Sequence, residues 1–174
     1  MLRLLAPAAV VATGLALLMG PAFGADSLPG GATSLTEVHG DWTVRCGVTN
    51  NVVQCAAQQE QLSSQTKQRV LAIELKTDNG AADGTLVLPF GLLLKNGAVL
   101  KVDDKMLSEP QPFQTCLPAG CLVPLTFGAD WAKALRAGTT LTITAQPVSG
   151  PDAKFTVSLQ GLGSALDRIT DLMK

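Results

Sequence analysis

The residues of this chain best suited to chemistry are four cysteines, which form two close pairs. Eight residues separate Cys46 from Cys55, and four separate Cys116 from Cys121. Paired thiols form disulfide bonds, bind zinc or act as redox centres. The cellular compartment decides between these uses, because disulfides persist only in oxidising surroundings.

The first 25 residues have the features of a cleavable signal peptide, which indicates export. Arg3 gives a positive start, residues 4–19 are a mostly apolar stretch, and small residues around Ala25 provide a cleavage site. The stretch contains Pro7 and is shorter than the roughly 20 residues of a membrane span, and we find no second candidate span in the mature chain. We expect a periplasmic or secreted protein, with outer-membrane association as an alternative.

Export favours disulfides over the other thiol chemistries. Four thiols allow three pairings, and the local bonds Cys46–Cys55 and Cys116–Cys121 are favoured because each pair flanks a turn, which brings Cα atoms into bonding range. A zinc site does not fit the eight-residue spacing. A thioredoxin-like site lacks its Cys-x-x-Cys motif. We therefore expect two disulfides, no metal and no cofactor.

No catalytic constellation is evident elsewhere. The single histidine, His39, would need an orienting acid and a nucleophile near it to act as a general base, and a solvated or capping role is the simpler interpretation. The carboxylates of Asp103 and Asp104 lie between lysines without a calcium-loop pattern, which indicates a charged turn. We expect no catalytic residues, and the sequence does not identify binding residues.

Two other groups of residues are candidates for ligand contacts. Trp42 alternates with Val44 and Cys46 on one face of a predicted strand, which favours a place in the core. A second tryptophan, Trp131, lies in a predicted helix. Six glutamines between residues 54 and 68 could line an interaction surface, although a solvated edge strand and loop is the plainer explanation.

The elements that position these residues are mostly short strands. Alternating apolar residues around Trp42 and after Asn51 predict a hairpin that turns at Asn50 and Asn51. Residues 86–94 read as a buried strand bent by its proline and glycine. Asn96 and Gly97 are a two-residue hairpin signal. We expect further strands at residues 113–116, 121–127, 139–145 and 155–159.

Two short helices are expected among the strands. Residues 130–137 have apolar residues at helical spacing, with Gly138 as a C-terminal cap. The C-terminal segment has an apolar face beginning at Leu162, and Ser164 with Asp167 resembles a capping box. This pattern predicts a mainly β protein, an antiparallel β-sandwich of immunoglobulin-like or jelly-roll-like type. The expected divisions are a signal peptide (1–25), a flexible mature N-terminus (26–38) and one domain (39–174).

Charge argues against nucleic acid as a partner. Arg3 is the only charged residue of the leader, so the net charge of −1 becomes −2 in the mature chain. No basic cluster is interleaved with aromatic residues, and tyrosine is absent. The composition suits a compact domain.

Four blocks of this sequence resemble the invasion-associated locus B family of exported alphaproteobacterial proteins. The first is residues 40–46 with Cys55, and the second comprises residues 88–91, 94–97 and 99–103. The third is residues 113–116 with 119–121, and the last is residues 157–162. The resemblance implies a single β-sandwich domain in the periplasm, outer membrane or extracellular space. The founding members are linked to host-cell invasion, and the resemblance brings no enzymatic activity or catalytic residues.

These observations together favour a non-enzymatic interaction module. Its expected partner is an unidentified protein or glycan in the envelope or outside the cell, met by loops and edge strands. An envelope-associated hydrolase is one alternative, and it would have to depend on the single histidine. A small-ligand carrier that opens onto residues 86–94 is the other.

Overall fold

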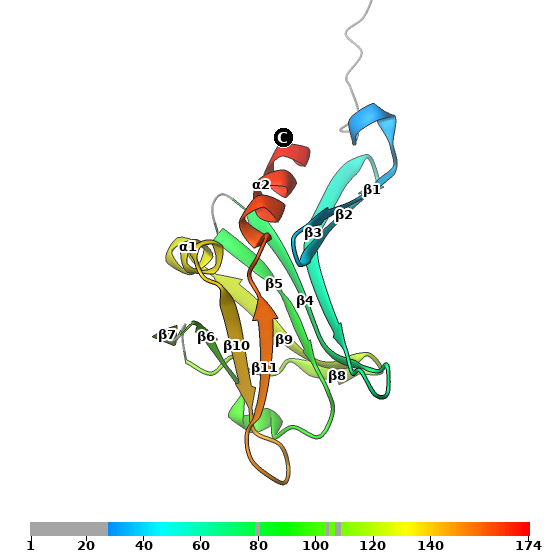
Figure 1. Cartoon of the computed structure of the whole chain (residues 1–174). Coiled ribbons are helices and arrows are strands. Elements are labelled where there is room, and N and C mark those ends of the chain that lie inside the picture. Colours follow the sequence, from blue (N-terminus) through cyan, green and yellow to red (C-terminus); the bar gives the residue numbers. More distant parts are fainter. Residues whose placement is uncertain (1–27, 79–80, 104, 107–108) are drawn as a thin grey trace, which may run out of the picture.

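Two antiparallel sheets and two α-helices make up the computed structural model, which describes residues 28–78, 81–103, 105–106 and 109–174 (Figure 1). The larger sheet has seven strands in the order β1-β2-β3-β4-β5-β9-β8, and the smaller has four in the order β11-β10-β6-β7. The large-sheet strands are β1 (Ser34–His39), β2 (Trp42–Thr49), β3 (Val52–Leu62), β4 (Arg69–Asp78), β5 (Ala81–Leu88), β9 (Gly120–Phe127) and β8 (Thr115–Leu117). The small-sheet strands are β11 (Ala153–Ser158), β10 (Thr140–Ala145), β6 (Ala98–Val102) and β7 (Lys105–Met106).

The helices are α1 (Ala129–Ala137) and α2 (Leu162–Leu172), and two short 3₁₀ turns are η1 (Pro29–Gly31) and η2 (Leu94–Asn96). The predicted mainly β class, with antiparallel pairing and a C-terminal helix, is confirmed. The strand order is neither immunoglobulin-like nor jelly-roll-like, because β1 to β5 follow one another as a continuous meander. Short turns between successive strands produce this order. The predicted signal peptide lies outside the described residues.

The β2–β3 hairpin shows how local sequence builds the meander. Asn50 and Asn51 both have positive φ angles, 52° and 60°, which a tight turn between twisted strands requires. The turn sets the register so that Cys46 lies opposite Cys55. Trp42 is fully buried, as its alternation with Val44 predicts.

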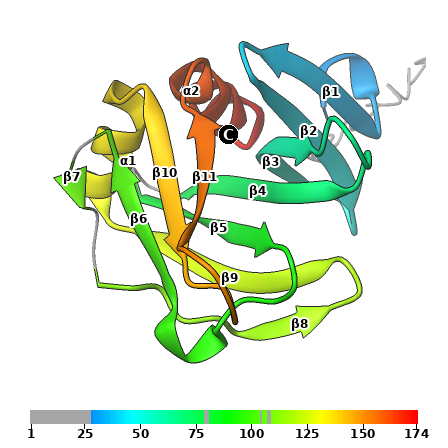
Figure 2. The same ribbon diagram turned by 60° about the horizontal axis from the view of Figure 1, so that its bottom comes forward.

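One core lies between the two sheets and under α2. Its buried residues come from the inner faces of both sheets, and α2 adds Leu162, Ala165, Leu166 and Ile169. Figures 1 and 2 show α2 beside β1 to β3 and the smaller sheet across β5 and β9. The Trp42 indole N–H donates to the carbonyl of Ser158, 2.8 Å away, and so ties the two sheets together.

The segment expected to be a flexible N-terminus is instead structured from Leu28 onward. Residues 34–39 form β1, which pairs with β2 along its whole length, and Leu28 is buried. The prediction was wrong because the glycines and proline before β1 suggested a tether. The strand itself has few apolar residues and is held by pairing with β2.

The region between β5 and β6 also departs from expectation. The predicted buried strand ends at Leu88, and its burial alternates instead of being continuous. Asn96 and Gly97 do not turn a hairpin: Gly97 ends η2 and leads into β6, which pairs with β10 in the other sheet. The reason is that β4 and β9 already occupy both edges of β5.

The predicted capping box of the last helix is absent. The N-cap of α2 is Gly161, so Ser164 lies inside the first turn, where its hydroxyl donates to the Gly161 carbonyl, 2.9 Å away. The Asp167 carboxylate instead bonds the guanidinium of Arg136 on α1, at 2.5 Å. Helix α1 begins one residue earlier than expected, and the N–H of its C-cap, Gly138, donates to Ala134.

Candidate functional site

The structure joins the four cysteines in two local disulfides. Cys46–Cys55 bridges β2 and β3 and is buried in the core, with Cα atoms 4.1 Å apart. Cys116–Cys121 closes the β8–β9 hairpin, with Cα atoms 3.9 Å apart, and Cys116 is exposed. Within the described ranges, no cluster of three or more histidine, cysteine or acidic side chains could hold a metal. The cysteines therefore act as crosslinks that hold two hairpins in register.

His39 stands in a small polar cluster at the end of β1. Its Nδ1 lies 3.3 Å from the Ser164 hydroxyl, and its Nε2 lies 3.5 Å from the Glu37 carboxylate. Glu37 also accepts two hydrogen bonds of 2.8 Å from the Arg168 guanidinium. The bond from Arg168 is the main cause that lowers the pKa of Glu37 below its usual value of 4.5.

This cluster brings together a serine, a histidine and a carboxylate, which sequence reasoning did not connect. Its hydrogen bonds serve packing, since the Ser164 hydroxyl donates to a backbone carbonyl and the Glu37 carboxylate is held by an arginine. A nucleophilic serine must instead donate to the imidazole. The cluster attaches α2 to β1.

The other singled-out residues are structural in this fold. Asp103 turns β6 into β7 and accepts bonds from the backbone and hydroxyl of Thr139, and the hydroxyl bond is the main cause that lowers its pKa. Asp104 lies outside the described residues. Trp131 is half-buried on α1. In the carrier hypothesis residues 86–94 open to a ligand, but Leu86 and Leu88 are packed in the core.

Two glutamines of β3 have a role that the sequence did not reveal. The Gln59 amide donates to the carbonyl of Ser158 at 3.0 Å, and the Gln61 amide donates to the carbonyl of Thr156 at 2.5 Å. Both carbonyls belong to β11, the edge strand of the smaller sheet. Side chains of the large sheet therefore cover the open edge of the small sheet. For Gln59 and Gln61 this role differs from both expected ones, a solvated edge strand and an interaction surface.

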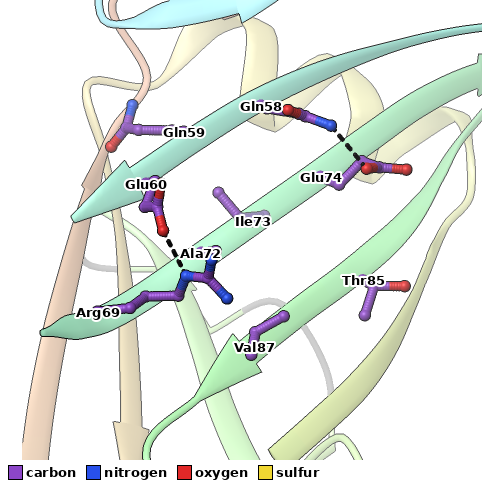
Figure 3. Close-up of a pocket in the computed structure, with 9 residues that line it drawn as sticks. All are labelled: Gln58, Gln59, Glu60, Arg69, Ala72, Ile73, Glu74, Thr85 and Val87. Carbon is purple, nitrogen blue, oxygen red and sulfur yellow. Dashed lines mark hydrogen bonds and ion pairs between the residues drawn. The ribbon is translucent and has the colours of Figure 1, made fainter. Parts of the chain in front are cut away.

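The outer face of β3, β4 and β5 contains a shallow groove of about 330 Å³ (Figure 3). Ala72 and Val87 lie opposite each other on β4 and β5 and form its floor. The groove exists because alanine is too small to fill the space between its longer neighbours. Its lining residues are Gln58, Gln59, Glu60, Arg69, Ala72, Ile73, Glu74, Thr85 and Val87.

Two polar pairs border the groove. The Gln58 amide donates to the Glu74 carboxylate at 2.8 Å, and the Glu60 carboxylate pairs with the Arg69 guanidinium. Figure 3 shows both pairs as contacts between the neighbouring strands β3 and β4. These partly exposed pairs contribute little to stability. They present charged and amide groups to an incoming molecule.

The surface continues past Arg69 to the end of the molecule where several loops meet. A second depression of about 540 Å³ is lined there by Gln68, Arg69, Pro89, Phe90, Pro118, Ala119 and Gly120. Phe90 is 62% exposed, and Leu62 and Leu117 nearby in the fold are also exposed. The sequence offered one signal for this surface: polar residues of β3 and β4 alternate with buried ones, which identifies an outer face.

The disulfides, the antiparallel sheets and the uncovered groove define a crosslinked, mainly β protein of the kind found outside the cytoplasm. The chain belongs to the invasion-associated locus B family, whose model matches residues 42–170. The predicted resemblance is thereby confirmed.

Three named proteins support the assignment. The chain is 47% identical to the invasion protein B homologue of Brucella abortus strain 2308, covering 86% of this chain and 87% of that protein. It is 35% identical to invasion protein B of Bartonella bacilliformis, covering 85% and 81%. The crystal structure of invasion associated protein b from Bartonella henselae matches with a TM-score of 0.75 and 31% identity, covering 80% of this chain and 97% of that one.

None of these names describes an enzyme. In the part of the chain that the structure describes, no helix has the length and apolar character needed to cross a bilayer.

Proposed function

We propose that this protein is an exported, non-enzymatic module that binds a partner protein through the groove on β3, β4 and β5. The observation that carries the proposal is the contrast between the two faces of the large sheet. The inner face is packed into the core, whereas the outer face has a small-residue floor between paired polar groups. Such a surface can receive a side chain in the floor and exchange hydrogen bonds at the rim.

The chemistry of the groove favours a protein over a glycan. None of its described lining residues is aromatic, and an aromatic ring is the side chain best able to lie flat against an apolar surface of a ligand. The adjacent depression adds exposed Phe90 and two prolines, which suit an apolar anchor from a protein. The partner then spans both depressions, with Arg69 between them.

The names of the relatives refer to invasion, which supports a partner in the bacterial envelope or on a host surface. The disulfides support a periplasmic or secreted location. Outer-membrane association would follow if the partner resides there.

The test is crosslinking in the native envelope, followed by mass spectrometry. Ala72→Phe fills the groove floor, and we expect the crosslinked protein to be lost. Thr126→Phe is the matched control, because Thr126 is exposed on the same outer face, on β9, outside the groove. A partner retained by Ala72→Phe, or lost from both variants, contradicts the proposed site.

A hydrolase is the second candidate. Ser164 lies within hydrogen-bond range of His39, and His39 lies within hydrogen-bond range of Glu37. Ester hydrolysis by the purified protein is expected at the background rate, and equal in His39→Ala. Hydrolysis that disappears in His39→Ala and in Ser164→Ala would establish catalysis instead. Native mass spectrometry tests the carrier alternative, which requires a copurifying small molecule.

A further inference from the structure

Strand β1 forms an edge of the large sheet, and the register shows which of its backbone groups face outward. The turn at Gly40 and Asp41 makes His39 and Trp42 a hydrogen-bonded pair, and the Val48 N–H donates to the Thr33 carbonyl at 3.0 Å. Odd-numbered residues of β1 therefore pair with β2. Ser34, Thr36 and Val38 direct their N–H and C=O groups away from it.

The other sheet edges are short or covered, which sets β1 apart. β7 has two residues, and β8 has three. The edge of β11 receives side-chain hydrogen bonds from Trp42, Gln59 and Gln61. β1 has six residues and contains no lysine, proline or bulge, three of the devices that protect an edge, and its one acidic residue, Glu37, is paired with Arg168 of α2. Val38 on this strand is 75% exposed.

From this edge we infer that β1 pairs with β1 of a second copy, antiparallel about a two-fold axis at Thr36. In this register Thr36 faces its own copy and Ser34 faces Val38, so that three pairs exchange backbone hydrogen bonds. Leu35 then lies opposite Glu37. A shift of two residues in one direction places Glu37 opposite itself, and a shift in the other direction leaves Val38 without a partner in β1.

Electrostatics supports a second copy as the occupant. Glu37 is the only acidic residue of β1, and Arg168 of the same chain already neutralises it. Two β1 strands therefore meet without uncompensated like charges. The two-fold axis is perpendicular to the joined sheet, so both outer faces lie on the same side. The dimer would present two grooves to one partner surface, which raises avidity.

Sedimentation velocity of the purified exported protein tests the pairing across concentrations of about 1 μM to 1 mM. We expect a concentration-dependent dimer for the unmodified protein. Thr36→Lys and Thr36→Glu each place like charges on the two-fold axis and should weaken the dimer by about tenfold or more. An equimolar mixture of the two variants should restore it as a heterodimer.

Thr126→Lys and Thr126→Glu are the matched controls and should dimerise like the unmodified protein. Thr36 is exposed at a solvent-facing edge, so thermal melts should show that its variants remain folded. A protein that is monomeric at every concentration overturns the inference. Dimerisation that survives both substitutions, or a mixture that does not restore it, places the interface elsewhere.

Discussion

Replacement of Gly161 by alanine tests the close approach of α2 to the β1–β2 turn. Gly161 has a φ of +89°, and a Cβ at this position would lie 2.0 Å from the His39 carbonyl oxygen. That separation is shorter than non-bonded atoms tolerate, so the turn or the helix must move. Gly91 is a matched control, because its φ is +88° and nothing lies within 4 Å of its Cβ position.

Both substitutions lose stability because alanine is strained at a positive φ angle. Only Gly161→Ala also creates a steric clash. Alanine in a left-handed conformation costs about 1–2 kcal/mol, which is the whole expectation for Gly91→Ala. Gly161→Ala also displaces the fully buried Leu162 and the hydrogen bond from Asp41 to Gln160. Disturbed packing costs about 1–3 kcal/mol and a lost hydrogen bond about 1 kcal/mol, so together with the backbone cost we expect a total of about 3–6 kcal/mol.

Urea unfolding followed by tryptophan fluorescence measures both free energies of unfolding. The dependence on urea concentration should keep its slope, because the surface exposed on unfolding is unchanged. A forced rearrangement should make the loss of unfolding free energy for Gly161→Ala exceed that for Gly91→Ala by more than about 1 kcal/mol. A smaller difference would mean that the close approach of Gly161 to His39 does not constrain the fold.

Three further outcomes can be measured on the same protein. Cys46→Ser should lower the free energy of unfolding by about 2–4 kcal/mol. The loss should be larger than for Cys116→Ser, because only the Cys46–Cys55 bond lies in the core. Thermal melts that are equal with and without reductant would refute a stabilising role for either bond. Gln59→Leu should lower the free energy of unfolding by about 1–2 kcal/mol, because it removes hydrogen bonds to the backbone carbonyls of Asp41 and Ser158. The exchange rate of amide hydrogens in β11 should then rise. An unchanged exchange rate would mean that solvent, and not Gln59, covers this edge. The pKa of Glu37 is lowered in the folded protein, so its carboxylate stabilises the fold above pH 4.5 and this contribution is lost as the pH falls through the folded pKa. Glu37→Gln should therefore lose less stability between pH 7 and pH 3 than the unmodified protein, and parallel pH profiles would contradict this assignment.

Local signals in the sequence were sufficient for much of the fold. Two adjacent asparagines turn the β2–β3 hairpin whatever the strands later contact, because a tight turn depends on the conformations of two residues. The alternation around Trp42 identifies the buried face, and the periodicity after Leu162 identifies the packed face of α2. The cysteine spacing and export signal together predicted the two local crosslinks.

Tertiary structure decided the features that depend on distant segments. β1 has little apolar content, and it is a strand because β2 offers an open edge. The Asn96–Gly97 signal did not make a hairpin, since both edges of β5 were already paired. Gln59 and Gln61 found carbonyls nearly one hundred residues away along the chain, which no local pattern encodes.

The candidate binding surface also depends partly on local sequence and partly on tertiary structure. The sequence by itself determined that Gln58 and Glu60 share one face of β3 and that Glu74 lies on the face of β4 opposite Ile73, because side chains alternate along a strand. Only the assembled sheet set Gln58 beside Glu74 and Glu60 beside Arg69 and placed a small alanine between them. A groove depends on the sizes of side chains on neighbouring strands, and their register is determined by pairing across the whole sheet.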